Sequence, residues 1–180
     1  MSRNIETDLE KIQELARQKE EENWEFRLFL KGLCPLSPEE IDRLVHKLNR
    51  EISSLIDCTK CGNCCRKIRP VLNHSDIERF AKGLNISVVQ FKEQYLVKCN
   101  EKGKFWFKTE PCPFLNNNNR CSQYLLRPAD CRSYPHLHKK DFVFRLINVI
   151  ENYAICPIVF NVYERLKSKL WHRGKIDEAI

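Results

Sequence analysis

Four cysteines fall within eight residues of this chain, in the run CTKCGNCC that starts at Cys58 and ends at Cys65. A Cys-x-x-Cys turn places two sulfur atoms on one side of a tight loop, where a single metal ion can accept both. Gly62 permits the positive φ that turns backbone N–H groups toward thiolates. Cys64 and Cys65 are adjacent and cannot easily bind one small ion together, so we expect them to serve two metals or two corners of a cluster. The run predicts metal ligation by Cys58, Cys61, Cys64 and Cys65.

A second, more dispersed group of cysteines is predicted to complete the coordination. Its members are Cys112, Cys121, Cys131 and Cys156. Proline follows the first and the last of them and stiffens the chain, while an arginine beside each of the other two favours the thiolate. Four plus four thiols suit two zinc sites, or an iron–sulfur cluster with spare thiols. Cys34 and Cys99 have no motif around them, and we expect them to be small buried hydrophobic residues.

Charged residues surround Cys131 in the segment RPADCR. Arg127 and Arg132 are expected either to support the metal ligands from the second shell or to form an anion pocket. The alternative is a turn held by salt bridges that involve Asp130, and both interpretations can hold together. Asp76 is interpreted as a carboxylate that stabilises the start of a helix.

The N-terminal region is highly charged and has no apolar core of the kind found in signal peptides. No stretch approaches the roughly 18 apolar residues of a membrane span. A cytoplasmic protein without membrane association is therefore expected. Because a reducing compartment disfavours disulfides, ten cysteines indicate metal ligands or catalytic thiols.

The formal net charge of +7 admits two explanations. Basic charge is typical of nucleic-acid binding, and Phe105, Trp106 and Phe107 could stack on single-stranded bases. In the explanation we favour, the excess Lys and Arg compensate a thiolate-rich centre. Eight thiolates and two divalent ions would bring the net charge from +7 to an ordinary +3.

Hydrophobic periodicity predicts a mainly α protein with small irregular or β elements: a metal-stabilised Cys-rich domain preceded by an N-terminal helical pair. The predicted domains are an N-terminal helical extension at 1–56, a cysteine-cluster domain at 57–160 and a C-terminal helix at 161–180 that packs on it. Helix starts are expected at three capping boxes, which begin at Ser37, Ser75 and Ser87, and at Asp141 and Pro157. A short hairpin is expected within 98–108.

The segments CTKCGNCC, HSDIERFAKGL, PCPFL, RCSQY, RPADCRSYP and the final CP resemble the YkgJ-type cysteine-cluster family. The resemblance extends over about 57–160 and fills all eight cysteine positions, although Gln123 stands where the family usually has an aliphatic residue. It implies that the domain chelates zinc or iron. The cysteine region is also similar to that of a flagellin lysine methylase, which implies an iron–sulfur centre, but this chain is much shorter.

Three functions follow from these patterns. The leading hypothesis is a non-catalytic protein that binds zinc or iron, with the N-terminal helices docking to an unidentified protein partner. The second is an iron–sulfur enzyme or redox module related to protein lysine methylation. The third, which is not favoured, is zinc-dependent nucleic-acid binding through loops that resemble zinc knuckles.

Overall fold

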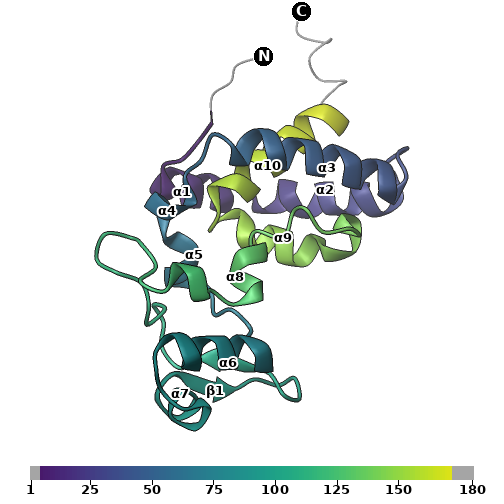
Figure 1. Ribbon diagram of the computed structural model, residues 1–180. Helices are drawn as coiled ribbons and strands as arrows, with labels where there is room; N and C mark the ends of the chain where they lie inside the picture. The colour runs from purple at the N-terminus through teal and green to yellow at the C-terminus, as the bar shows by residue number, and fades with distance from the viewer. Residues whose placement is uncertain (1–4, 172–180) are drawn as a thin grey trace, which may run out of the picture. The chain divides into compact units, whose positions relative to one another are not determined.

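The structure is a computed structural model that describes residues 5–171, and its chain divides into two compact units (Figure 1). Residues 5–57 and 135–171 form one, called here the helical unit, and residues 58–134 form the other, called the cysteine unit. The domain boundaries proposed from the sequence stay a prediction.

The prediction of a mainly α protein with small β elements is confirmed. The helical unit contains α1 (Leu9–Gln18), α2 (Glu20–Gly32), α3 (Pro38–Ser53), the 3-10 turn η2 (Phe142–Arg145), α9 (Leu146–Tyr153) and α10 (Pro157–Leu170). The cysteine unit contains α4 (Cys58–Cys61), α5 (Asn63–Lys67), α6 (His74–Gly83), α7 (Val88–Tyr95), β1 (Leu96–Lys98), β2 (Phe105–Phe107), the 3-10 turn η1 (Tyr124–Leu126) and α8 (Ala129–Ser133).

In the helical unit, α10 packs against α3 and α9. The predicted capping box at Ser37 is confirmed, since its hydroxyl accepts from the Glu40 N–H while the Glu40 carboxylate accepts from the Ser37 N–H. The predicted start of the last helix at Pro157 is also confirmed. The apolar face of α3 is buried through residues spaced three or four apart, namely Ile41, Val45, Leu48 and Ile52.

A buried lysine links α10 to the N-terminal helices. The side chain of Lys167 is 1% exposed, and its ammonium group lies 2.7 Å from a Glu22 carboxylate oxygen and 2.9 Å from the Asn23 side-chain oxygen. It also pairs with Glu164, which in turn pairs with Lys19. A buried ammonium group is tolerated only when it is paired and hydrogen-bonded, and this network meets both conditions.

Helical structure begins after Asp141 as predicted, but the predicted side-chain cap is wrong. Asp141 caps no helix with its side chain; it adopts φ 62°, and η2 precedes α9. The capping carboxylate comes instead from Asp42, whose oxygens accept from the backbone N–H groups of Asp141 and Phe142 at 2.8 and 2.9 Å. Local sequence pointed to the nearest acidic residue, but the tertiary fold supplies one from α3.

In the cysteine unit, α6 and α7 pack on each other around stacked aromatic rings. The Phe80 ring lies 5.3 Å from that of Phe91 and 5.1 Å from that of Phe114. The capping box predicted at Ser87 is confirmed, with Gln90 as its partner. The one predicted at Ser75 is wrong, because the N-cap of α6 is Asn73 and Asp76 completes that box.

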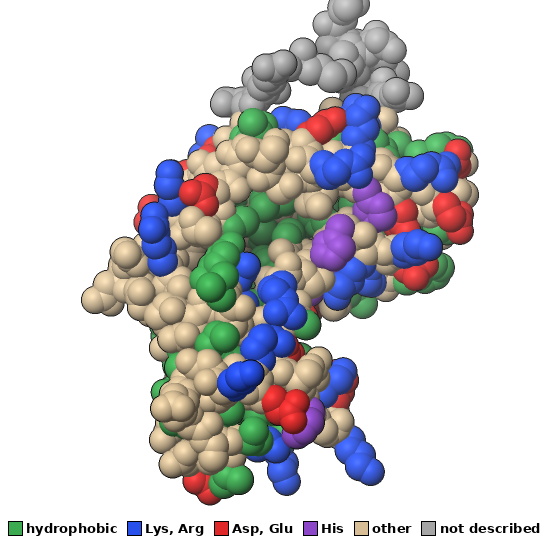
Figure 2. Space-filling model, in the orientation of Figure 1, with side chains coloured by type: hydrophobic (Ala, Val, Ile, Leu, Met, Phe, Trp, Pro, Cys, Tyr) green, Lys and Arg blue, Asp and Glu red, His purple; other side chains and the backbone are tan. Residues whose placement is uncertain are grey.

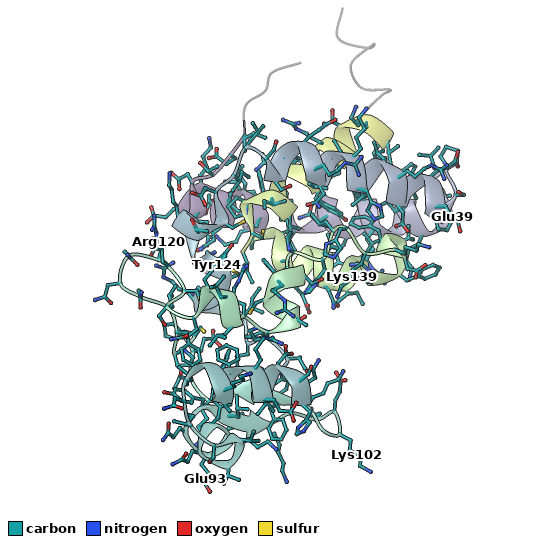
Figure 3. The ribbon with its side chains drawn as sticks, in the orientation of Figure 1. Glu39, Glu93, Lys102, Arg120, Tyr124 and Lys139 are labelled. Carbon is teal, nitrogen blue, oxygen red and sulfur yellow. The ribbon has the colours of Figure 1, made fainter. Side chains whose placement is uncertain are left out.

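The predicted hairpin is present, and it begins two residues earlier than expected. Leu96 pairs with Phe107 and Lys98 with Phe105 in an antiparallel sheet of two strands. Lys102 lies in the turn that joins them (Figure 3). Among residues 5–171, no helix is both long and apolar enough to span a bilayer.

Candidate metal centre

Seven of the eight predicted ligands belong to the cysteine unit, and one does not. Cys58, Cys61, Cys64, Cys65, Cys112, Cys121 and Cys131 all lie within residues 58–134. Cys156 lies in the helical unit, where it is 6% exposed and directly precedes α10. All ten cysteines of the chain lie in the described part, and none of them forms a disulfide.

The dense cysteine run folds into two short helices, α4 and α5, separated by Gly62. This glycine has φ +61°, the left-handed conformation expected from its place after Cys61. A Cβ atom built on it would lie 2.8 Å from the backbone oxygen of Asn119, so only glycine fits this close approach. The backbone conformation and the packing therefore both require glycine here.

Asn119 holds this cysteine loop from outside it. Its side-chain nitrogen donates to the Lys60 backbone oxygen at 3.3 Å, and its side-chain oxygen accepts from Arg66. The Arg66 guanidinium also donates to the Cys61 backbone oxygen at 3.2 Å. In the sequence, nothing in the run of four asparagines at 116–119 singles out the last one.

The next two cysteines lie on a tight loop that joins the first run through its backbone. The Cys112 N–H donates to the Cys65 oxygen at 2.8 Å, which ties the two ligand segments together. Leu115 pairs with Cys121 in an isolated antiparallel bridge, and this closes the loop between Cys112 and Cys121. Arg120, labelled in Figure 3, projects from the loop just before Cys121.

Four thiols from three separate segments are close enough for their charges to interact. Negative charge on Cys65 raises the pKa of Cys112, Cys121 and Cys131, and Cys112 and Cys121 act on Cys131 in the same way. Burial is the larger cause in each case and brings the pKa of Cys112 to about 11. The unit therefore gathers Cys65, Cys112, Cys121 and Cys131 as one group, called here the four-thiol group.

Cys65 has the opposite shift. A hydrogen bond with the Cys64 thiol lowers the pKa of Cys65, burial opposes this, and the positive charges of Arg127 and Arg66 lower it further, to about 7. Cys65 is therefore the thiol of the group that most readily supplies a thiolate near neutral pH.

The two predicted arginines differ in what surrounds them. The Arg127 guanidinium carbon lies 3.5 Å from the centre of the Tyr124 ring, and its Nε donates to the Tyr124 backbone oxygen at 2.9 Å. Tyr124 is labelled in Figure 3. The positive charge of Arg127 also lowers the pKa of Cys65 and of Cys121, which favours their thiolate forms. Arg132 lies in α8 next to Cys131, and its support of the metal ligands stays a prediction.

The net positive charge of the described residues lies in the unit that carries these cysteines. Residues 58–134 contain 14 Lys and Arg against six Asp and Glu, a formal charge of +8. The described residues of the helical unit contain 14 against 16, a formal charge of −2. Figure 2 shows Lys and Arg side chains distributed around α6 and α7. The excess of Lys and Arg over Asp and Glu is thus in the unit where the negative charge of thiolates would need compensation.

The thiols have the donor chemistry that zinc and iron prefer; Cys58 is exposed, Cys156 is buried, and the other six candidates are partly buried. Within residues 5–171, no three Cys, His, Asp or Glu side chains stand in an arrangement that could hold a metal ion as they are. Thiolate ligands must lose their protons before they bind, and metal sites are rarely complete without the metal. The membership of the ligand set therefore stays a prediction.

A family model for the CxxCxxCC domain, whose description reads "putative zinc- or iron-chelating domain", matches residues 57–149. The match covers just over half of the 180 residues and includes every cysteine of the cysteine unit. Cys156 lies outside it. Comparisons with curated proteins and with solved structures gave no match.

Proposed function

Because this chain belongs to the CxxCxxCC family, we propose that its cysteine unit binds zinc or iron through thiolates. The first ligand set in this proposal is the four-thiol group, because four thiolates can close a tetrahedral site around one ion. The metal would join the dense cysteine run to the Cys112–Cys121 loop and to α8. The loop contributes Phe114 to the apolar core, whereas the dense run and α8 contribute no buried hydrophobic side chain among the described residues. Metal binding would therefore contribute directly to folding of the run and of α8.

The observation that carries the proposal is the 2.8 Å backbone hydrogen bond that joins Cys112 to Cys65, 47 residues away in the sequence, at a point where Cys65 also interacts electrostatically with Cys121 and Cys131. Thiols that repel one another when ionised are costly to gather without a compensating cation. A divalent ion removes that cost, and the formal charge of +8 on this unit offsets the remaining negative charge.

Cys58, Cys61 and Cys64 form a second thiol group in this proposal. Cys64 and Cys65 are adjacent and would serve different metals, or different corners of one cluster. The Cys61 loop is braced by Arg66 and Asn119, so its backbone is held in place. Assignment of Cys156 as a further ligand stays a prediction from the sequence.

Anaerobic purification followed by elemental analysis and a visible spectrum tests the proposal and identifies the metal. Colourless protein with stoichiometric zinc would establish a zinc chelator. A brown protein with iron, sulfide and visible absorption would establish an iron–sulfur cluster, and would favour the second hypothesis of an enzyme or redox module. Protein without either metal, even after reconstitution with each under reducing conditions, would refute the proposal.

Two substitutions test the ligand set. Cys131→Ser and Cys112→Ser should each lower the bound metal and destabilise the cysteine unit, because serine is a poor ligand for these metals. Cys99→Ser is the matched control: it lies in the same unit, but its thiol donates to the Glu101 backbone oxygen at 3.6 Å, in the hairpin turn. Equal metal content in the two ligand variants and the control would contradict the assignment.

The concentration of positive charge also supports a second candidate, nucleic-acid binding by the cysteine unit. Lys92 lies 5.1 Å from the centre of the Phe105 ring, and Trp106 is partly exposed beside it. Phe107 is only 1% exposed and belongs to the core, so it is not available for stacking on bases. Binding of single-stranded RNA or DNA that weakens steeply with salt would support this function. Absence of binding at low salt would exclude it.

A further inference from the structure

Asp76 does more in the structure than start a helix. It is 1% exposed and completes the capping box of α6 with Asn73, as a helix-start carboxylate does. Its Oδ1 also accepts from the backbone N–H of Ala129 at 3.0 Å, which lies 53 residues further along the chain. Ala129 is the first residue of α8, the short helix that carries Cys131. The carboxylate therefore joins the start of α6 to the start of a ligand-bearing segment.

Arg79, one turn further along α6, holds the residues just before α8. Its Nη2 donates to the Arg127 backbone oxygen at 2.9 Å, and its Nε donates to that of Leu126 at 3.3 Å. The same Nη2 pairs with the Asp76 carboxylate. The planar guanidinium thus bridges one carboxylate and two carbonyl oxygens in a fixed geometry, which a lysine ammonium could not reproduce.

A further hydrogen bond ties α8 to the segment before α6. The Asp130 carboxylate accepts from the Val71 backbone N–H at 3.1 Å, so α8 is also tied to the segment that leads into α6. Four hydrogen bonds therefore hold residues 126–130 to residues 71–79. Three are made by the backbone atoms of Leu126, Arg127 and Ala129. The fourth joins the Asp130 carboxylate to the Val71 backbone. Cys131 follows directly.

We propose that Asp76 and Arg79 are positioning residues that set the place of Cys131, and of Arg127 beside it, for metal binding. The inference rests on the proposed function. Neither residue binds the metal; each acts through the backbone of 126–131. Carboxylate and guanidinium partners of this kind orient ligands, and their removal typically weakens metal binding by about 10- to 100-fold.

The capping box of α7 provides a matched comparison. Ser87 and Gln90 exchange the same pair of hydrogen bonds, at 3.1 and 2.9 Å, in a helix that packs on α6 in the same unit. Neither of these side chains is hydrogen-bonded to the segment that carries Cys131. A substitution in this box removes a helix cap from the same unit but no hydrogen bond to the segment that carries Cys131. Such a variant therefore distinguishes an effect on ligand position from a general loss of stability.

The test uses the full-length chain with Co²⁺ as a spectroscopic probe in competition with a chelator. Asp76→Asn and Arg79→Lys should each bind Co²⁺ about 10- to 100-fold more weakly than the unsubstituted chain. Both should also lose thiolate-to-cobalt charge-transfer intensity, as is expected of Cys131→Ser, because a displaced thiolate leaves the coordination. Ser87→Ala should retain the affinity and the spectrum. Arg79→Lys preserves charge, so it remains informative if Asp76→Asn fails to fold.

The outcomes are distinguishable. Unaltered affinity and spectrum in folded Asp76→Asn or Arg79→Lys would overturn the positioning role while leaving metal binding intact. An equal loss in Ser87→Ala would also overturn it, because the effect would then follow from general destabilisation. Failure of the unsubstituted chain to bind Co²⁺, Zn²⁺ or Fe²⁺ would refute the proposed function and this inference with it.

Discussion

Substitution of Gly62 by alanine should damage the cysteine unit far more than the same substitution at Gly103. Both glycines have positive φ, +61° and +76°, so alanine pays a backbone cost of about 1–2 kcal/mol at either position. Their surroundings differ. The added Cβ would lie 2.8 Å from the Asn119 backbone oxygen at Gly62, whereas it would meet nothing within 4 Å at Gly103.

The contact at Gly62 is with backbone, so relief requires the 116–120 loop to move. Forcing an extra methyl group into a packed site typically costs a further 1–3 kcal/mol or so, which brings the expected loss for Gly62→Ala to roughly 2–5 kcal/mol. Any gain from a stiffer unfolded chain is shared by both variants and cancels in the comparison. The movement would also weaken the bonds of Asn119 to Arg66 and to the Lys60 backbone.

Equilibrium urea denaturation at a fixed free metal concentration, followed by circular dichroism, measures both losses. Metal affinity by chelator competition should fall for Gly62→Ala and stay unchanged for Gly103→Ala. If the two variants unfold at the same urea concentration and bind metal equally, the approach of Asn119 to the cysteine loop has no energetic role.

Two further predictions concern the helical unit. Lys167→Met should lower its stability by about 3–5 kcal/mol, because Glu22 and Glu164 lose their buried ammonium partner; thermal denaturation should show no comparable loss for Lys169→Met on the exposed side of α10. Burial raises the pKa of Glu164, but Lys167, Lys19 and Tyr153 outweigh it and hold the pKa below the ordinary 4.5. Such a carboxyl group stabilises the fold above its unfolded-state pKa and loses that contribution as pH falls through the folded-state pKa. Melting temperatures should therefore fall below about pH 4.5 in the natural chain and less steeply in Glu164→Gln; parallel curves would contradict this.

Local sequence patterns predicted the helices well where the capping partners are neighbours. Ser37 with Glu40 and Ser87 with Gln90 each satisfy the first turn of a helix from within four residues, so the sequence contains the whole interaction. The prediction was wrong where the partner is remote. The N–H of Asp141 is satisfied by Asp42, 99 residues away, and no local pattern indicates such a bond.

The same distinction applies to the candidate site. Chemistry and spacing singled out seven of the eight cysteines of the cysteine unit as candidate ligands, and they indicated the flexibility needed at Gly62. They did not reveal Asn119, whose asparagine neighbours look alike in sequence, and they interpreted Asp76 by its helix alone. Its bond to Ala129 exists only because the core around Phe80 places α6 beside the segment that precedes α8.

The sequence by itself determined which atoms can bind metal: thiols in a Cys-x-x-Cys-x-x-Cys-Cys run and in three later segments, in a chain with excess basic charge. The tertiary structure decided which of them meet. Cys65 interacts electrostatically with Cys112, Cys121 and Cys131, and the excess of basic over acidic residues lies in the same unit. Residue type fixes the chemistry of a ligand, but its neighbours depend on loop closure and long-range hydrogen bonds, which only the folded chain defines.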